Sequence, residues 1–100
     1  MFNLVIDLEM CKVPRDYRSN SYKYATETIQ IGAVLLDDSF KRIGTLCQYV
    51  HPEHGVIDYF IENLTGIKNS QVKNAPKLEE VLLHMIDWLG ERDYKIYAWS

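Results

Sequence analysis

The fold is decided by a short apolar run that ends in two acids, Phe2-Asn3-Leu4-Val5-Ile6-Asp7-Leu8-Glu9. Residues 2–6 are almost continuously apolar and include β-branched side chains, which is typical of a strand buried on both faces at the centre of a sheet. Because successive side chains of a strand point to opposite faces, Asp7 and Glu9 project from one face and Leu8 from the other. The stretch therefore predicts a central strand with two carboxylates at its carboxyl end.

Segments with strand or helix periodicity follow this run, separated from it by a polar stretch over residues 11–26 that predicts a long loop. The predicted elements, in chain order, are strands over 28–36 and 43–50, short helical pieces over 57–64 and 68–73, a helix over 76–89 and a strand over 94–99. The turn signal at residues 37–39 predicts that the two middle strands form an antiparallel hairpin.

The most clearly periodic segment is residues 76–89, where apolar side chains recur at steps of three and four and Gly90 follows the last of them. A strand that follows a helix normally returns parallel to a neighbouring strand by a right-handed crossover. The predicted class is therefore α/β: a mixed sheet with three antiparallel strands, flanking helices, and a fourth strand parallel to the first, with at least one exposed edge.

Composition narrows the function classes. Hydrophobic residues make up 47% of the chain and charged residues 25%, and the net charge is −3, so the chain is globular and carries no global basic field for nucleic acid. The apolar run at the start is too short to span a bilayer or to direct export, so we expect no membrane partner and a cytoplasmic location. The two cysteines, Cys11 and Cys47, and the three histidines lack the spacing of a disulfide scaffold or a zinc site.

The carboxylate pair can be interpreted either as two solvated surface acids or as part of a functional site. An Asp-x-Glu triplet is common and usually consists of two solvated acids. At the carboxyl end of an apolar central strand, however, Asp7 and Glu9 would lie where open α/β sheets bind ligands. Two carboxylates that share one space are best stabilised by a divalent cation, and oxygen-only ligands favour Mg²⁺ or Mn²⁺.

Four different short motifs follow one another along the chain. They are Val5-Ile6-Asp7-Leu8-Glu9-Met10-Cys11, Glu27-Thr28-Ile29-Gln30-Ile31-Gly32-Ala33-Val34, Asn63-Leu64-Thr65-Gly66-Ile67 and Ile96-Tyr97-Ala98-Trp99-Ser100. In this order they resemble the first motif, the second strand, the nucleotide-contacting segment and the strand before the second motif of the DEDDh-type 3′-5′ exonucleases. The chain most resembles the histone-mRNA and RNA-interference-related branch of that family, and the resemblance spans essentially the whole chain.

The resemblance implies an RNase H-like fold and hydrolysis of phosphodiester bonds at the 3′ end of single-stranded RNA or DNA. By this resemblance Asp7 and Glu9 are catalytic residues that hold two Mg²⁺ or Mn²⁺ ions. The resemblance also implies that a pocket for the 3′-terminal nucleotide is shaped by Met10, Cys11, Leu64 and Thr65. Gln30 departs from the acid often found at its position, which leaves its role open.

The family's remaining acids and its general-base histidine lie downstream of the strand that residues 96–99 resemble. We therefore expect residues 1–100 to form the N-terminal part of a single exonuclease domain whose site is completed beyond residue 100. The isolated fragment is predicted to be inactive. His51, His54 and His84 occupy the wrong segments to replace the missing base.

The basic loop, the aromatic side chains and the function itself each have an alternative interpretation. The basic and tyrosine-rich loop over residues 11–26 suits single-stranded nucleic acid, although solvated loops often have this composition. Tyr59, Phe60 and Trp88 are expected to be core residues rather than stacking platforms. The rival function is a non-catalytic module of the same fold that binds nucleic acid or protein, and a third reading is a homodimer formed through the exposed fourth strand.

Overall fold

A computed structural model describes residues 1–99 of the protein. The elements, in chain order, are β1 (Phe2–Lys12), the 3₁₀ turn η1 (Arg15–Tyr17), β2 (Thr26–Leu36), β3 (Arg42–Tyr49), α1 (Tyr59–Thr65), α2 (Asn69–Val72), α3 (Leu78–Leu89) and β4 (Tyr94–Trp99). The four strands form one sheet in the order β3-β2-β1-β4. β1 pairs antiparallel with β2 and parallel with β4, which confirms the predicted mixed sheet.

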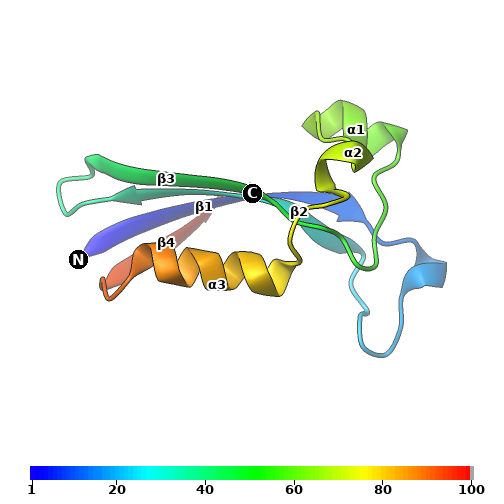
Figure 1. Ribbon diagram of the computed structural model, residues 1–100, viewed down its shortest axis with the longest axis horizontal. Helices are drawn as coiled ribbons and strands as arrows, with labels where there is room; N and C mark the ends of the chain where they lie inside the picture. Colours follow the sequence, from blue (N-terminus) through cyan, green and yellow to red (C-terminus); the bar gives the residue numbers. More distant parts are fainter. Residues whose placement is uncertain (100) are drawn as a thin grey trace.

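The helices lie on both faces of the sheet, with α3 on one face and α1 and α2 at one end of the other (Figure 1). Each face has its own apolar cluster. The cluster beneath α3 consists of Leu4, Ile31, Ala33, Leu35, Val50, Val81, Met85 and Leu89. The cluster beneath α1 and α2 consists of Cys11, Ile29, Ile57, Ile61, Ile67 and Val72. The sheet is therefore a central layer, as a strand with buried side chains on both faces requires.

An irregularity in β2 allows one strand to serve both clusters. Glu9 pairs with Gln30 and Met10 pairs with Thr28, so Ile29 has no partner on β1. An extra residue of this kind, a β-bulge, inverts the alternation of the strand that contains it. Ile31 accordingly packs beneath α3, whereas Ile29, two residues earlier, packs beneath α1 and α2.

β1 is longer than the sequence predicts. The predicted strand ended at residue 6, but in the structure β1 continues to Lys12, which pairs with Thr26. The predicted loop over residues 11–26 is therefore wrong at both ends, and the connection covers residues 13–25. Pairing with β2 stabilises the polar end of β1, and this long-range contact is not encoded in the local hydrophobic pattern.

The predicted helices are all present, with shifted ends. Asp58 accepts a hydrogen bond from the Ile61 amide (2.9 Å) and caps α1, and Gly66 ends it with φ +76°, a conformation that glycine adopts without steric cost. Trp88 packs against the α3 cluster as predicted. The prediction that Tyr59 and Phe60 are core residues is wrong, since they are 79% and 59% exposed.

α3 is the longest helix, at 12 residues, and buries a single stripe of side chains at steps of four: Val81, Met85 and Leu89. Several of its other apolar side chains are exposed. Within residues 1–99 no helix has the length and apolar character needed to cross a membrane.

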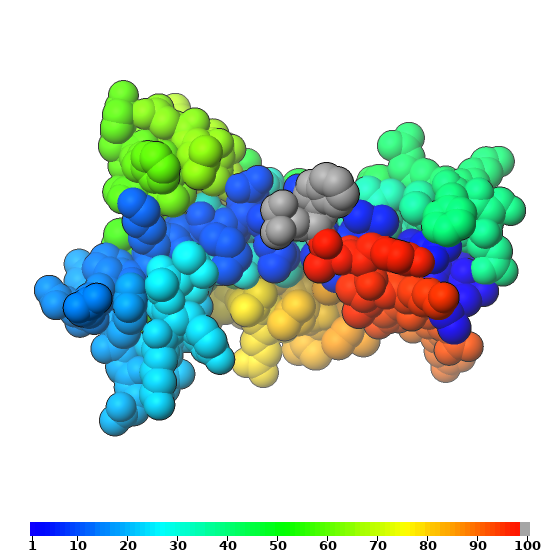
Figure 2. All heavy atoms as spheres, turned by 180° about the vertical axis from the view of Figure 1, so that it is seen from behind, coloured from blue at the N-terminus to red at the C-terminus, as the bar shows by residue number. Residues whose placement is uncertain are grey.

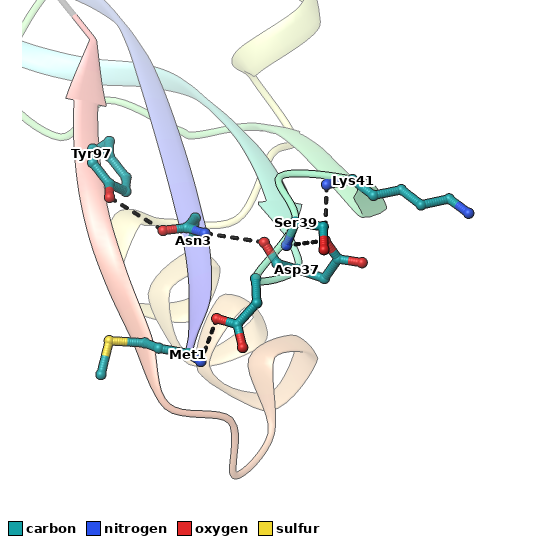
Figure 3. A network of polar contacts seen from close by, with 7 residues as sticks. Met1, Asn3, Asp37, Ser39, Lys41 and Tyr97 are labelled. Atoms are coloured by element: carbon teal, nitrogen blue, oxygen red, sulfur yellow. Dashed lines mark hydrogen bonds and ion pairs between the residues drawn. The ribbon is translucent and has the colours of Figure 1, made fainter.

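The end of the sheet opposite α1 is joined by a buried asparagine. The Asn3 side chain donates to the Asp37 carbonyl (3.1 Å) in the β2–β3 turn and accepts from the Tyr97 hydroxyl (3.2 Å) on β4 (Figure 3). Asp37 also accepts from the Ser39 and Lys41 amides, both at 2.9 Å, and so closes the predicted hairpin. The view from the β4 side shows β4 at the surface with β1 beside it (Figure 2). Among the described residues β4 is an outermost strand, so the predicted exposed edge is confirmed.

Candidate active site

Asp7 and Glu9 lie on the face of β1 that α1 and α2 partly cover. Leu4 and Ile6 pack beneath α3, so the alternate positions of β1 point the other way. Cys11, two residues beyond Glu9, is buried in the α1–α2 cluster, which places the whole series Asp7, Glu9 and Cys11 on that face. Asp7 is exposed and Glu9 is half-buried. The predicted juxtaposition of the two carboxylates is thus what the strand produces.

The neighbouring strands leave room at the carboxylates. Gly32 of β2 lies opposite Asp7 and has no side chain to cover it. On the other side β4 runs parallel to β1 and reaches Asp7 with Trp99. On the β2 side Asp7 is therefore bordered by backbone alone, and its side chain is exposed.

No cation neutralises the pair within residues 1–99, where the only ion pairs join Met1 to Asp38, Lys12 to Asp58 and Lys77 to Glu53. Nor do three or more Asp, Glu, His or Cys side chains of these residues gather into a set that could hold a metal alone. Two carboxylates on one open face have the donor chemistry that Mg²⁺ and Mn²⁺ prefer. Asp7 and Glu9 would supply two carboxylate ligands to such an ion.

Gln30 occupies the position on β2 directly across from Glu9. Its amide Nε2 donates to Cys47 Sγ on β3 at 3.4 Å. An acid at this position would put a third negative charge beside Asp7 and Glu9, whereas the amide adds none. Gln30 therefore joins β2 to β3 without adding to the charge that a bound cation must offset.

α1 lies next to β1 and carries two of the predicted pocket residues. Leu64, near its end, is 69% exposed and is available to a ligand. The Thr65 hydroxyl is half-buried, donates to the Ile61 carbonyl (2.8 Å) and accepts from the Ile67 amide (3.1 Å). Thr65 thus helps to end the helix, and its hydroxyl is already satisfied within the protein.

The other two predicted pocket residues do not present their side chains to this space. Met10 accepts a hydrogen bond from Thr28 (3.3 Å), whose side chain borders a groove with Leu8 and Leu82 on the α3 face. Cys11 is on the carboxylate face but only 1% exposed. Strand alternation thus turns the Met10 side chain to the α3 face, and the α1–α2 cluster covers that of Cys11. Their role in shaping a nucleotide pocket stays a prediction.

Burial raises the pKa of the Cys11 thiol to about 11, and the negative charge of Glu27 adds to the rise. Glu27 is buried at 9% exposure. Its carboxylate accepts hydrogen bonds from three consecutive backbone amides, those of Glu53 (2.7 Å), His54 (2.8 Å) and Gly55 (2.6 Å). Sequence reasoning missed this residue. The signal in the sequence was that Glu27 continues the two-residue period of the buried positions of β2. Because a buried charge requires partners, an acid at such a position indicates a carboxylate that accepts hydrogen bonds.

Some basic side chains of the segment over residues 11–26 already make contacts within the protein. Lys12 Nζ lies 3.8 Å from Asp58 and 4.7 Å from the centre of the Phe60 ring. The Arg18 guanidinium donates to the Val13 carbonyl (3.1 Å) and holds the loop in place. Arg15 is exposed on η1. Of the arginines in this loop, Arg15 is therefore the one left to meet a ligand.

Comparison with known proteins identifies the fold and the family. A sequence model of the RNase T exonuclease family matches residues 4–97. The nuclease domain of 3′hExo, described as a DEDDh family member bound to rAMP, superposes with a TM-score of 0.76 at 26% identity, covering 97% of this chain and 50% of that one. A 3′-exonuclease described in recognition of a histone mRNA stem-loop gives a TM-score of 0.78 at 25% identity, with 99% and 36% covered. The fold is thus the RNase H-like fold that the resemblance implied.

Among curated proteins, human ERI1 exoribonuclease 2 is 33% identical over 88 residues, which are 86% of this chain and 12% of that protein. The PolC-type DNA polymerase III of Caldanaerobacter subterraneus subsp. tengcongensis is 42% identical over 62 residues, which are 62% of this chain and 4% of the polymerase. The chain thus spans a small part of each of these relatives. With a family match over nearly all of its length and DEDDh 3′ exonucleases as structural neighbours, the chain belongs to the RNase T exonuclease family.

Proposed function

We propose that this chain is the N-terminal part of a 3′-5′ exonuclease domain that hydrolyses phosphodiester bonds at the 3′ end of single-stranded RNA or DNA. The observation that carries the proposal is the pair Asp7 and Glu9 on one open face of β1, without a cationic partner in residues 1–99. Burial of such a pair would be costly, and solvent access keeps it ready for a ligand.

Asp7 and Glu9 would hold two divalent ions, Mg²⁺ or Mn²⁺, together with acids that lie beyond residue 100 in the complete protein. Bound ions of this kind supply an activated water and stabilise the leaving oxygen of the phosphodiester. The chain's own contribution is geometric: pairing with β2 and β4 fixes the backbone on both sides of Asp7, and so fixes the point from which its side chain extends.

The proposed place for the 3′-terminal nucleotide is the space between the carboxylates and α1. Leu64 offers an exposed apolar side chain there, which suits contact with a base. Arg15, exposed on η1, is a candidate for contact with the phosphates of the preceding nucleotides. The relatives bound to rAMP and to a histone mRNA stem-loop support RNA as a substrate class.

The test is degradation of a 5′-labelled single-stranded RNA and its DNA counterpart by the complete protein in Mn²⁺. We expect a ladder that shortens from the 3′ end. Asp7→Asn, which removes one charge without changing shape, should slow it at least about 100-fold, the scale of losing one electrostatic stabiliser in an active site. The matched control is Asp87→Asn, the same change on an exposed position of α3, which should leave the ladder unchanged.

Residues 1–100 alone should not degrade the oligonucleotide, because they carry only two of the acids that the site requires. A well-folded complete protein that binds the oligonucleotide but leaves it intact in Mn²⁺ would instead support the non-catalytic binding module. Equal rates for Asp7→Asn and Asp87→Asn would contradict the assignment of Asp7 to the site.

A further inference from the structure

A buried acid that the proposed chemistry does not use connects the sheet to the helix beside the carboxylates. Glu27 lies near the start of β2 and pairs with Cys11 of β1. Its two carboxylate oxygens accept from the amides of Glu53, His54 and Gly55, at 2.6 to 2.8 Å. Hydrogen bonds this short to a carboxylate belong to the stronger class found in proteins.

These amides belong to the segment over residues 51–58, which connects β3 to α1. The same segment is held against the end of β1. The Val56 amide donates to the Lys12 carbonyl (2.8 Å), and a Cβ added to Gly55 would lie only 2.5 Å from Cys11 Sγ. Asp58 then caps α1 and lies 3.8 Å from Lys12 Nζ. The contacts run without a gap from Glu27 to the first turn of α1.

The strand that anchors this segment is also the strand that bears the carboxylates. Cys11 and Lys12 follow Glu9 by two and three residues on β1. The distance between the carboxylates and the exposed Leu64 of α1 is therefore set partly by the segment that Glu27 holds. α1 also contacts the sheet through the apolar cluster, whose contacts are not directional, and through Phe60, whose ring centre lies 4.7 Å from Lys12 Nζ.

We propose that Glu27 is a positioning residue, which sets the place of α1 relative to Asp7 and Glu9 and thereby the fit of the terminal nucleotide. This inference rests on the proposed exonuclease function. Glu27 touches neither substrate nor metal in this scheme, and acts through the amides of residues 53–55.

The experiment compares Glu27→Gln with Glu53→Gln in the complete protein. The first keeps the shape of the side chain but turns an acceptor oxygen into an amide donor that faces N–H donors. The second makes the same chemical change in the anchored segment, on a side chain that points to Lys77 at 3.1 Å in an exposed ion pair. Exposed pairs of this kind contribute little to stability, so Glu53→Gln is the matched control.

For Glu27→Gln we expect the amides of residues 53–55 to lose hydrogen-exchange protection while the amides of the sheet keep theirs. KM for the oligonucleotide should rise about tenfold and kcat should fall less than about threefold. The reason is that a displaced α1 weakens contacts that the protein makes equally with the bound substrate and with the transition state. Glu53→Gln should match the wild type in both measurements.

A folded Glu27→Gln protein with exposed loop amides and an unchanged KM would overturn the inference. Should Glu27→Gln fail to fold, Glu27→Asp keeps the charge, draws the carboxylate back by one methylene, and must show the same rise in KM. Should the wild type degrade nothing, the proposed function fails separately. The inference is then decided by the oligonucleotide Kd, which must weaken about tenfold in Glu27→Gln and not in Glu53→Gln.

Discussion

Replacement of Gly55 by alanine is the most stringent test of how the segment over residues 51–58 sits on the sheet. The new Cβ would lie 2.5 Å from Cys11 Sγ, 2.7 Å from the Lys12 carbonyl oxygen and 3.2 Å from a Glu27 oxygen. An ordinary contact needs about 3.5 Å. Cys11 is only 1% exposed and the Lys12 carbonyl already accepts from Val56, so neither neighbour is free to yield.

The segment must therefore move outward by about 1 Å, the difference between these distances and an ordinary contact. Overpacking of this kind costs about 1–3 kcal/mol, and a weakened hydrogen bond to a carboxylate adds about 1.5–3 kcal/mol. The lower chain entropy of unfolded alanine returns about 0.4–1 kcal/mol. We expect Gly55→Ala to lower the free energy of unfolding by about 1.5–5.5 kcal/mol, the sum of these terms.

Urea unfolding followed by circular dichroism measures this difference, provided that the slope with urea stays unchanged. Two other glycines calibrate the result. A Cβ at Gly44 would meet Trp88 Cζ2 at 3.2 Å, and the nearest neighbour of one at Gly32, among the described residues, is the Asp7 carbonyl oxygen at 3.7 Å. The expected order of destabilisation is Gly55→Ala, then Gly44→Ala, then Gly32→Ala. A Gly55→Ala protein as stable as Gly32→Ala would refute the close docking of this segment.

Single side chains give further predictions about pH dependence, thiol reactivity and oligonucleotide binding. Burial raises the pKa of the Cys11 thiol from 9.0 to about 11, so the stability gained from its neutral form is present below pH 9 and is lost as the pH rises toward 11. A plot of unfolding free energy against pH should fall more steeply in this window for the wild type than for Cys11→Ala, in which only other groups such as Tyr22, whose pKa burial also raises, still contribute. Cys47, which is exposed, should react with a thiol reagent at pH 8 well before Cys11 does. Arg15→Ala should weaken oligonucleotide binding by the complete protein and reduce the slope of log K against log salt by about one, as expected for one lost phosphate contact; Arg18→Ala should instead loosen the loop, because its guanidinium holds the Val13 carbonyl. An unchanged salt slope in Arg15→Ala would favour a merely solvated loop.

Much of the site was predictable because it depends on local periodicity. The alternation of β1 alone places Asp7 and Glu9 on one face, whatever the strand pairs with. The helical period over residues 76–89 likewise predicts a stripe that packs on the sheet, and α3 buries Val81, Met85 and Leu89 along it. Patterns of this kind need no partner to be recognised.

The pocket residues were less predictable. Met10 and Cys11 are adjacent in the first motif, and resemblance assigned both to the pocket, but adjacent residues of a strand face opposite ways. Only the pairing of β1 beyond Glu9 shows that both residues still belong to the strand, and only the α1–α2 cluster shows that Cys11 is covered. Tyr59 and Phe60 have the composition of core residues, yet they lie on the outer side of α1 and are exposed.

The class of fold, the order of strands and helices along the chain, and the carboxylate pair could be inferred from the amino-acid sequence alone, because each follows from hydrophobic periodicity or from a motif contained in a short segment. Three features instead depend on tertiary contacts: the bulge at Ile29, the extension of β1 to Lys12, and the hydrogen bonds from residues 53–55 to Glu27. These features join segments up to 28 residues apart. Each of them involves backbone amides or carbonyls, which nearly every residue carries, so the side-chain pattern does not reveal which of these groups meet.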